Sequence, residues 1–123
     1  MTNILIIEDD KSMRKIYEAY FRGSDKYKIE ILEDARLGYK RAKEGDFDLV
    51  LLDMIMEPMS GGEFYACFED DPAMKKAPVI VVSVIDPVDL EHMKKYGEVS
   101  FIKKPVTKEQ LFEKIDDVLS GKL

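Results

Sequence analysis

Leu49-Val50-Leu51-Leu52-Asp53 is an unbroken apolar run that ends in a carboxylate. A continuous run of this kind predicts a strand buried on both faces of a parallel sheet, because helices cover both faces and only the strand ends reach water. Asp53 is therefore expected at the carboxyl end of a strand. A single aspartate in that place is weak evidence of function, so the other strands decide what it means.

Four further stretches predict strands, and segments with a helical spacing of apolar residues separate them. The predicted strands cover residues 4–7, 28–32, 48–53, 78–83 and 99–102, and the predicted helices cover residues 13–21, 34–45, 60–71, 86–96 and 107–119. The strand at 28–32 alternates more and is expected nearer an edge. This alternation of elements predicts an α/β fold of the (βα)₅ type, with one parallel sheet, right-handed crossovers and helices on both faces.

Local signals support the helix assignments. Ser60 with Glu63, and Thr107 with Gln110, match the capping box that begins a helix. Apolar residues define an inner face on the first and last helices. The predicted inner faces are Met13, Ile16, Tyr17, Tyr20 and Phe21 in the first helix, and Leu111, Phe112, Ile115, Val118 and Leu119 in the last. The helix at 86–96 has the thinnest apolar face of the five.

Length and composition limit the classes to which the chain can belong. Its 123 residues are 46% apolar and 36% charged, which is typical of one globular domain. No apolar run reaches the roughly 18 residues that span a bilayer, and the N-terminus does not resemble a signal peptide. Cys67 is the only cysteine, which fits a reducing cytoplasm. The formal charge of −6 argues against direct nucleic-acid binding by this domain.

Polar side chains follow four of the five predicted strands. The carboxyl ends of parallel strands meet at one edge of the sheet, where ligands bind, so these residues are expected to form one site. Each alone has an ordinary explanation as a helix cap, a turn residue or a solvated charge, but chance explains the whole set poorly. The set is Glu8, Asp9 and Asp10 after the first strand, Asp53 after the third, Ser83 at the end of the fourth and Lys104 after the fifth.

The side chains of this set suit phosphoryl transfer. Clustered carboxylates repel one another unless a cation shares the site, and an all-oxygen ligand set favours Mg²⁺. Asp53 can act as a nucleophile that forms an aspartyl-phosphate. Mg²⁺, the ammonium of Lys104 and the hydroxyl of Ser83 can each hold one phosphoryl oxygen.

These motifs resemble those of the receiver domain of two-component response regulators. The resemblance rests on the run from Ile4 to Asp10, the segment from Leu49 to Gly61, Val81-Val82-Ser83 and Lys104-Pro105, and it covers residues 1–123 in motif order and spacing. It implies a CheY-like, flavodoxin-like sheet in the order 2-1-3-4-5. It also implies that Asp53 accepts a phosphoryl group from a histidine of a sensor kinase or a phosphotransfer protein.

The resemblance further implies roles for individual residues. Asp9 and Asp53 would bind Mg²⁺ directly, Glu8 would help through water, and the backbone carbonyl of Ile55 would be a further ligand. Ser83 and Phe101 would be the switch pair, although Phe101 is equally explained by core packing. A downstream output protein or domain would read the fourth helix, fifth strand and fifth helix. Such a domain catalyses only its own phosphorylation and dephosphorylation and is not a turnover enzyme.

The chain departs from the family pattern beside Asp53. Glu57 stands where the family usually has proline, and proline follows at position 58. Glu57 is expected to face water rather than bind metal. Ile55, Val84 and Ile85 are apolar at positions that border the phosphoryl group, which leads to the hypothesis that they hinder the attacking water and prolong the phosphorylated state. The only histidine, His92, is expected to be a solvated residue and not a phosphate carrier.

Three rival classes share parts of this pattern. A haloacid-dehalogenase-type phosphatase needs a second aspartate two residues after the nucleophile, where this chain has Ile55. An FMN-binding flavodoxin needs a hydroxyl- and glycine-rich loop after the first strand, where Glu8, Asp9 and Asp10 would repel phosphate. The alternative that stays open is a phosphorylation-independent protein-protein interaction module, a pseudo-receiver, which the departure at Glu57 would suit.

Overall fold

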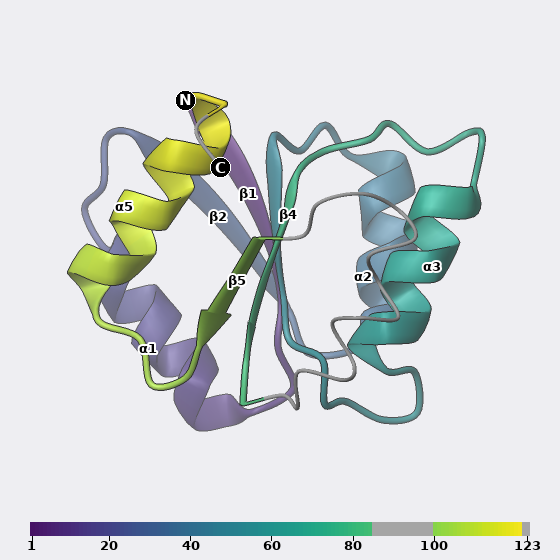
Figure 1. The fold of residues 1–123 in the computed structure, drawn as a ribbon, viewed down its shortest axis with the longest axis horizontal. Helices are drawn as coiled ribbons and strands as arrows, with labels where there is room; N and C mark the ends of the chain where they lie inside the picture. The colour runs from purple at the N-terminus through teal and green to yellow at the C-terminus, as the bar shows by residue number, and fades with distance from the viewer. Residues whose placement is uncertain (85–99, 122–123) are drawn as a thin grey trace.

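The computed structural model describes residues 1–84 and 100–121, which form a five-stranded parallel sheet between two layers of helices (Figure 1). The strands are β1 (Thr2–Ile7), β2 (Tyr27–Leu32), β3 (Leu49–Leu52), β4 (Val79–Ser83) and β5 (Ser100–Lys103), in the order β2-β1-β3-β4-β5. The described helices are α1 (Lys11–Phe21), α2 (Ala35–Glu44), α3 (Gly61–Asp70) and α5 (Lys108–Leu119). The predicted fold and strand order are confirmed, and the strand at 28–32 is an edge strand. The predicted helix at 86–96 lies outside the described residues.

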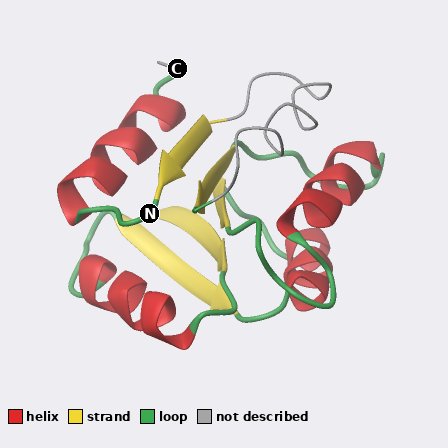
Figure 2. Ribbon diagram, turned by 60° about the horizontal axis from the view of Figure 1, so that its bottom comes forward, coloured by secondary structure: helices red, strands yellow, loops and turns green. Residues whose placement is uncertain are grey.

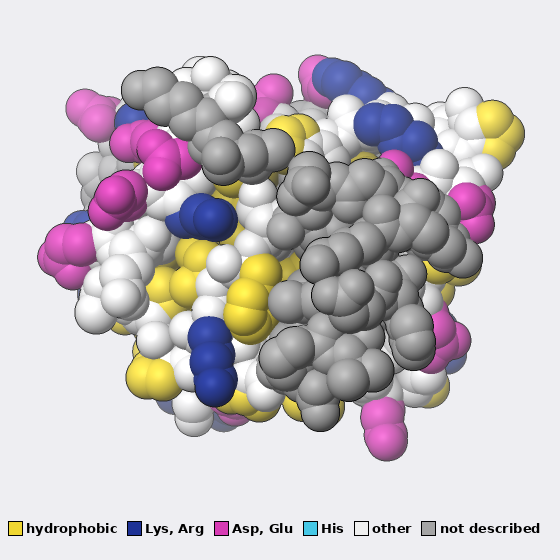
Figure 3. Space-filling model, in the orientation of Figure 1, with side chains coloured by type: hydrophobic (Ala, Val, Ile, Leu, Met, Phe, Trp, Pro, Cys, Tyr) yellow, Lys and Arg dark blue, Asp and Glu magenta, His cyan; other side chains and the backbone are white. Residues whose placement is uncertain are grey.

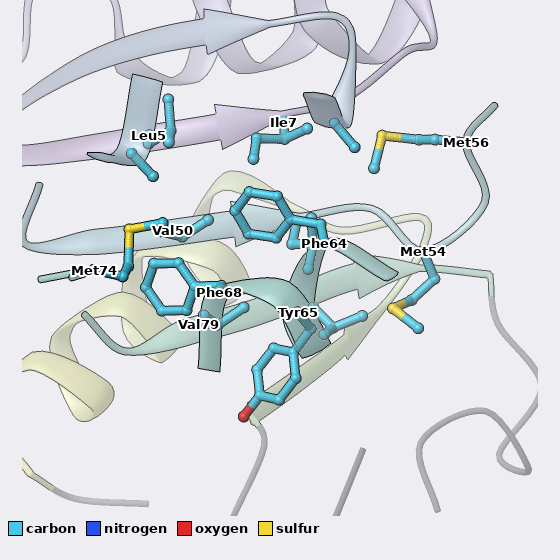
Figure 4. Packing of buried hydrophobic residues seen from close by; sticks show 14 residues of the cluster. Leu5, Ile7, Val50, Met54, Met56, Phe64, Tyr65, Phe68, Met74 and Val79 are labelled. Carbon is cyan, nitrogen blue, oxygen red and sulfur yellow. The ribbon is translucent and has the colours of Figure 1, made fainter. Parts of the chain in front are cut away.

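The strands are apolar on both faces because each face has its own core. Helices α1 and α5 cover one face, and α2 and α3 cover the other (Figures 1 and 2). Successive residues of a strand point to opposite faces, so Ile4 and Ile6 pack in the core under α1 and α5, while Leu5 and Ile7 pack in the other. Figure 4 shows this second core, in which the rings of Phe64 and Phe68 stack 5.7 Å apart.

The helices begin where the local signals in the sequence predict, but not every residue of their predicted inner faces is buried. Both capping boxes form, with the side chain of Ser60 accepting from the Glu63 amide and that of Thr107 accepting from the Gln110 amide. Ile16, which was predicted to lie on the inner face of α1, is exposed, and that prediction is wrong. The buried residues Met13, Tyr17 and Phe21 repeat every four positions and leave Ile16 at the margin of the stripe.

Several element boundaries differ by one or two residues from the sequence predictions, and so does the exposure of Leu119. Strand β5 spans Ser100–Lys103 instead of residues 99–102, and Val99 lies outside the described residues. Leu119, at the last turn of α5, is also exposed, since the apolar stripe of that helix ends at Val118. Within the described part of the chain, no helix has the length and apolar character needed to cross a membrane.

Candidate functional site

The strand ends are brought together by the register of the sheet. Ile7 of β1 lies beside Leu52 of β3, and Ser83 of β4 lies beside Lys103 of β5. The polar residues that follow these positions therefore emerge at the same edge. Hydrogen bonds extend the strand pairing into the connections, since the Asp53 amide donates to the Ile7 carbonyl at 3.1 Å and the Lys104 amide donates to the Ser83 carbonyl at 3.0 Å.

Three carboxylates lie next to one another at this edge. Glu8 is 1% exposed and Asp53 is 6% exposed, while Asp9 reaches solvent. One carboxylate oxygen from each of the three lies within 4.8 Å of the others. Asp10 is not part of the group, because its side chain caps α1 by accepting from the Ser12 amide at 3.2 Å. Of the four carboxylates that the sequence predicted for the site, three are therefore present there.

Lys104 lies between two of these carboxylates. Its Nζ is 2.6 Å from Glu8 Oε1 and 3.7 Å from Asp53 Oδ2. The ammonium is therefore hydrogen-bonded to Glu8 and only close to Asp53. Because the lysine side chain is flexible and its three N–H groups can turn, it can follow a new negative charge placed on Asp53.

Ser83 is fully buried, and its Oγ has no hydrogen-bond partner among the described residues. A buried hydroxyl without a partner is uncommon and calls for an explanation such as a bound group. Phe101 pairs with Val81 across β4 and β5 and packs, half-buried, against the core under α2 and α3. Its position agrees with core packing, and its role as a switch residue stays a prediction.

The apolar residues in the segment after Asp53 differ in their exposure to solvent. Met54 and Met56 are buried in the core, whereas Ile55 is 61% exposed and the Ile55 amide lies 3.4 Å from Asp53 Oδ1. Glu57 is exposed, as expected for a residue that faces water. Val84 is 58% exposed beyond the end of β4. Ile85 and His92 lie outside the described residues.

The electrostatics of the site favour a cation. Burial, and then the neighbouring Asp53, raise the pKa of Glu8 to about 7, and Lys104 opposes this shift. Burial and Asp53 also raise the pKa of Asp9. Both shifts mean that the ionised carboxylates are poorly compensated by the protein alone. Carboxylate oxygens this close, with no thiol or imidazole among them, fit a hard ion such as Mg²⁺.

A dependence of stability on pH follows from Glu8. A carboxyl whose pKa is raised on folding contributes stability that is complete below its unfolded value of 4.5 and is lost as the pH rises through about 7. We therefore expect the metal-free wild type to lose stability relative to Glu8→Gln between pH 5 and pH 8. Thermal unfolding in EDTA measures this difference. The exposed Glu57→Gln is the control, and it should keep the pH dependence of the wild type; equal slopes for all three proteins would contradict the prediction.

The sequence did not reveal the roles of two further residues at the site. Gly61 was named only as the last residue of a segment that resembles the family, yet its amide donates to the Met54 carbonyl, and a Cβ at this position would meet the backbone of Asp53. Arg14 was not noted at all, yet its guanidinium donates to the carbonyls of Glu8 and Asp9. A basic residue one turn after an N-cap such as Asp10 is the only sequence signal that could have indicated it.

The chain is similar to proteins of known class. It matches the family model described as "Response regulator receiver domain" over residues 4–116. It is 29% identical over 120 residues to the response regulator ArlR of Staphylococcus haemolyticus, and the alignment covers 97% of this chain and 53% of ArlR. The chain thus spans about half the length of that relative.

Solved structures show the same fold. The Vibrio cholerae chemotaxis protein CheY4 matches with a TM-score of 0.85 and 24% identity, over 96% of this chain and 98% of that chain. The receiver domain of the sensor histidine kinase PA1611 of Pseudomonas aeruginosa, a structure with a magnesium ion coordinated in the active site cleft, matches with a TM-score of 0.84 and 19% identity, over 97% of this chain and 98% of that chain.

Proposed function

The chain belongs to the family of response regulator receiver domains, and from that membership we propose that it is a phosphorylation-dependent switch whose phosphoacceptor is Asp53. One observation carries the proposal. The buried Asp53 carboxylate shares a sheet edge with the Lys104 ammonium, 3.7 Å away, and with the Ser83 hydroxyl, which has no hydrogen-bond partner among the described residues. A phosphoryl group on Asp53 would give both of these groups an oxygen to bind.

The transfer step needs little covalent chemistry from the protein. A carboxylate oxygen of Asp53 attacks the phosphorus of a phosphohistidine on the donor, the O–P bond forms, and the N–P bond breaks. The imidazole leaves with the electron pair of that bond and takes up a proton from water. Lys104 shifts from Glu8 toward the phosphoryl oxygens, and the Ser83 hydroxyl donates a hydrogen bond to one of them.

The carboxylates of Asp9 and Asp53 would hold Mg²⁺, with Glu8 behind them and the Ile55 carbonyl as a further ligand. When bound, the ion supplies neutralisation of the negative charge that gathers between carboxylate and phosphate. The magnesium ion in the cleft of the PA1611 receiver domain supports this assignment by analogy. Burial of Glu8 beside Lys104, at 2.6 Å, supports an indirect role for Glu8, since one of its oxygens is already paired.

The partners that we propose follow from the family. The phosphodonor is a sensor histidine kinase or a histidine phosphotransfer protein, and the reaction occurs in the cytoplasm, where an unpaired, exposed Cys67 is compatible with reducing conditions. The output partner reads the side of β5 and α5, where Phe101, Lys103, Gln110 and Lys114 line a shallow groove. Figure 3 shows this face, with acidic side chains gathered over α5 and apolar side chains beside them. The fourth predicted helix, which the sequence also assigns to the output face, lies outside the described residues.

Intact-mass spectrometry tests the proposed function. The protein is incubated with acetyl phosphate and Mg²⁺, and a gain of about 80 Da, the mass of one phosphoryl group, is expected. The same incubation with EDTA should give no gain, because the carboxylate and the incoming phosphate then repel each other. Absence of any gain with acetyl phosphate or with phosphorylated histidine donors would favour the alternative, a phosphorylation-independent interaction module.

A slow loss of the phosphoryl group is a further expectation. Ile55 lies two residues after Asp53, and Val84 directly follows Ser83 at the end of β4. Both expose large apolar side chains, which can cover the phosphoryl group and hinder the attacking water. We expect Val84→Ala to shorten the half-life of the phosphorylated protein several-fold, measured by the decay of the added mass after removal of the donor. Cys67→Ala, on the exposed side of α3, is the control. A half-life of seconds in the wild type would contradict the hypothesis.

A further inference from the structure

Arg14 reaches back from the first turn of α1 to the loop that carries the acidic residues. Its Nη1 lies 2.8 Å from the carbonyl oxygen of Asp9 and 3.1 Å from that of Glu8, so one nitrogen donates to two consecutive carbonyls. Its Nη2 lies 3.6 Å from a carboxylate oxygen of Glu33 in the β2–α2 connection. The Arg14 side chain is 21% exposed, so most of it is removed from competing water.

The carbonyls that Arg14 binds belong to a segment with few other restraints. Strand β1 ends at Ile7, and the Glu8 amide continues the pairing by donating to the Leu32 carbonyl at 3.0 Å. Beyond that bond, the Asp10 amide makes a long 3.4 Å contact to the Glu8 carboxylate, and α1 begins only at Lys11. Arg14 therefore joins the start of the helix to the end of the strand across the two residues whose carboxylates form the site.

The contacts of Arg14 indicate positioning rather than direct charge compensation. Its guanidinium touches the backbone of Glu8 and Asp9, while the charged group bonded to the Glu8 carboxylate is Lys104, at 2.6 Å. Among the described residues it forms an ion pair with Glu33, whose side chain is 69% exposed, and an exposed pair at 3.6 Å contributes little. The value of Arg14 to the site thus lies in the two carbonyl bonds.

We propose that Arg14 is a positioning residue for the phosphorylation site, which fixes the Glu8–Asp9 peptide so that the two carboxylates are held ready for Mg²⁺. The inference rests on the proposed function, because it concerns the metal that the function requires. Groups that orient the ligands of a metal typically change its affinity by about 10- to 100-fold when they are removed. Arg14 acts on the backbone of the ligands, so the lower end of that range is expected.

The test is Mg²⁺ binding by the unphosphorylated chain, measured by isothermal titration calorimetry well below the unfolding temperature. We expect Arg14→Gln to raise the Mg²⁺ dissociation constant about 10-fold. Arg14→Lys should recover part of the affinity, since an ammonium can still donate to the two carbonyls. Arg36→Gln is the matched control, because it removes an arginine of the same charge, at the start of α2, whose partner among the described residues is Asp34. Its dissociation constant should stay within about twofold of the wild type.

The phosphorylation reaction gives a second readout that a general loss of structure would not produce. In Arg14→Gln, the Mg²⁺ concentration for half-maximal phosphorylation by acetyl phosphate should rise by the same factor as the dissociation constant, while the rate at saturating Mg²⁺ returns to within about twofold of the wild type. If both Arg14 variants bind Mg²⁺ as well as the wild type, or if Arg36→Gln weakens binding equally, the role of Arg14 is overturned. A wild type that binds no Mg²⁺ overturns the proposed function and this role together.

Discussion

Asp53→Asn is expected to abolish the gain of about 80 Da that the proposed function predicts for the wild type with acetyl phosphate and Mg²⁺. The amide is not a nucleophile toward phosphorus under these conditions, so the effect should be complete rather than partial. The readout is intact mass after incubation with donor for a time that phosphorylates the wild type fully. Asp9→Asn is the matched control, since it removes one carboxylate of the same cluster and leaves the acceptor in place. It should still be phosphorylated at high Mg²⁺, more slowly.

The same substitution is expected to stabilise the metal-free protein. Asp53 is buried beside Glu8, and its side chain, after burial itself, raises the pKa of Glu8. Replacing Asp53 by its neutral isostere removes that effect and leaves the bond between Lys104 and Glu8 intact. We expect a gain in the free energy of unfolding of about 1 kcal/mol, because one unit of pKa corresponds to about 1.4 kcal/mol. Urea unfolding in EDTA at pH 8 measures it.

The two results together separate the proposed function from its alternative. A stabilised Asp53→Asn that no longer gains mass would show that a folded protein has lost its acceptor. A variant that still gains the phosphoryl group would place the acceptor elsewhere and contradict the assignment of Asp53. A variant that is destabilised would show that Asp53 is a structural partner of Lys104, as in an interaction module that has no use for phosphate.

Much of the fold could be predicted because each strand carries its own strong signal. The apolar runs at Ile4–Ile7 and Leu49–Leu52 are buried on both faces, as continuous apolar runs in parallel strands require. The strand order could not be predicted in this way, because it depends on the face of the sheet on which each crossover helix lies, and no local sequence pattern encodes that. It came from the resemblance to a family. Ile16 was misplaced because a residue at the margin of an amphipathic stripe can fall on either side of the boundary.

The sequence predicted which residues lie in the site, but not which of them form hydrogen bonds with one another. Strand ends in a parallel sheet must share an edge, so Glu8, Asp53 and Lys104 had to be neighbours once the topology was given. That Lys104 bonds to Glu8 and not to Asp53, and that the Ser83 hydroxyl is left without a partner among the described residues, depends on tenths of an ångström in three dimensions. Sequence spacing holds no information at that scale. Arg14 escaped for the same reason, because its targets are backbone carbonyls, which every residue has.

Gly61→Ala is expected to destabilise the protein by about 2–3 kcal/mol, the effect of forcing an extra carbon into a site already filled. A Cβ at this position would lie 2.0 Å from the carbonyl oxygen of Asp53 and 2.7 Å from the Cα of Met54. Both atoms belong to the backbone, so no side chain can turn away to make room. The segment after Asp53 or the start of α3 must move instead, and the Gly61 amide would lose its 3.0 Å bond to the Met54 carbonyl.

That displacement should reach the chemistry, because the Asp53–Met54 backbone places the acceptor carboxylate and leads to Ile55. We expect phosphorylation of Gly61→Ala by acetyl phosphate to slow about 10-fold or more, since small misplacements of reacting groups are costly. Gly62→Ala is the matched control one residue on in α3. Its Cβ would approach the flexible end of Met54 at 3.4 Å and the Ser60 Oγ at 3.7 Å, both side-chain atoms at ordinary contact distance, and alanine favours the helix over glycine by about 1 kcal/mol. Urea unfolding should therefore show Gly62→Ala as stable as the wild type or more so. Similar losses in the two variants would mean that α3 tolerates no change at its start, and that Gly61 has no special part in seating Asp53.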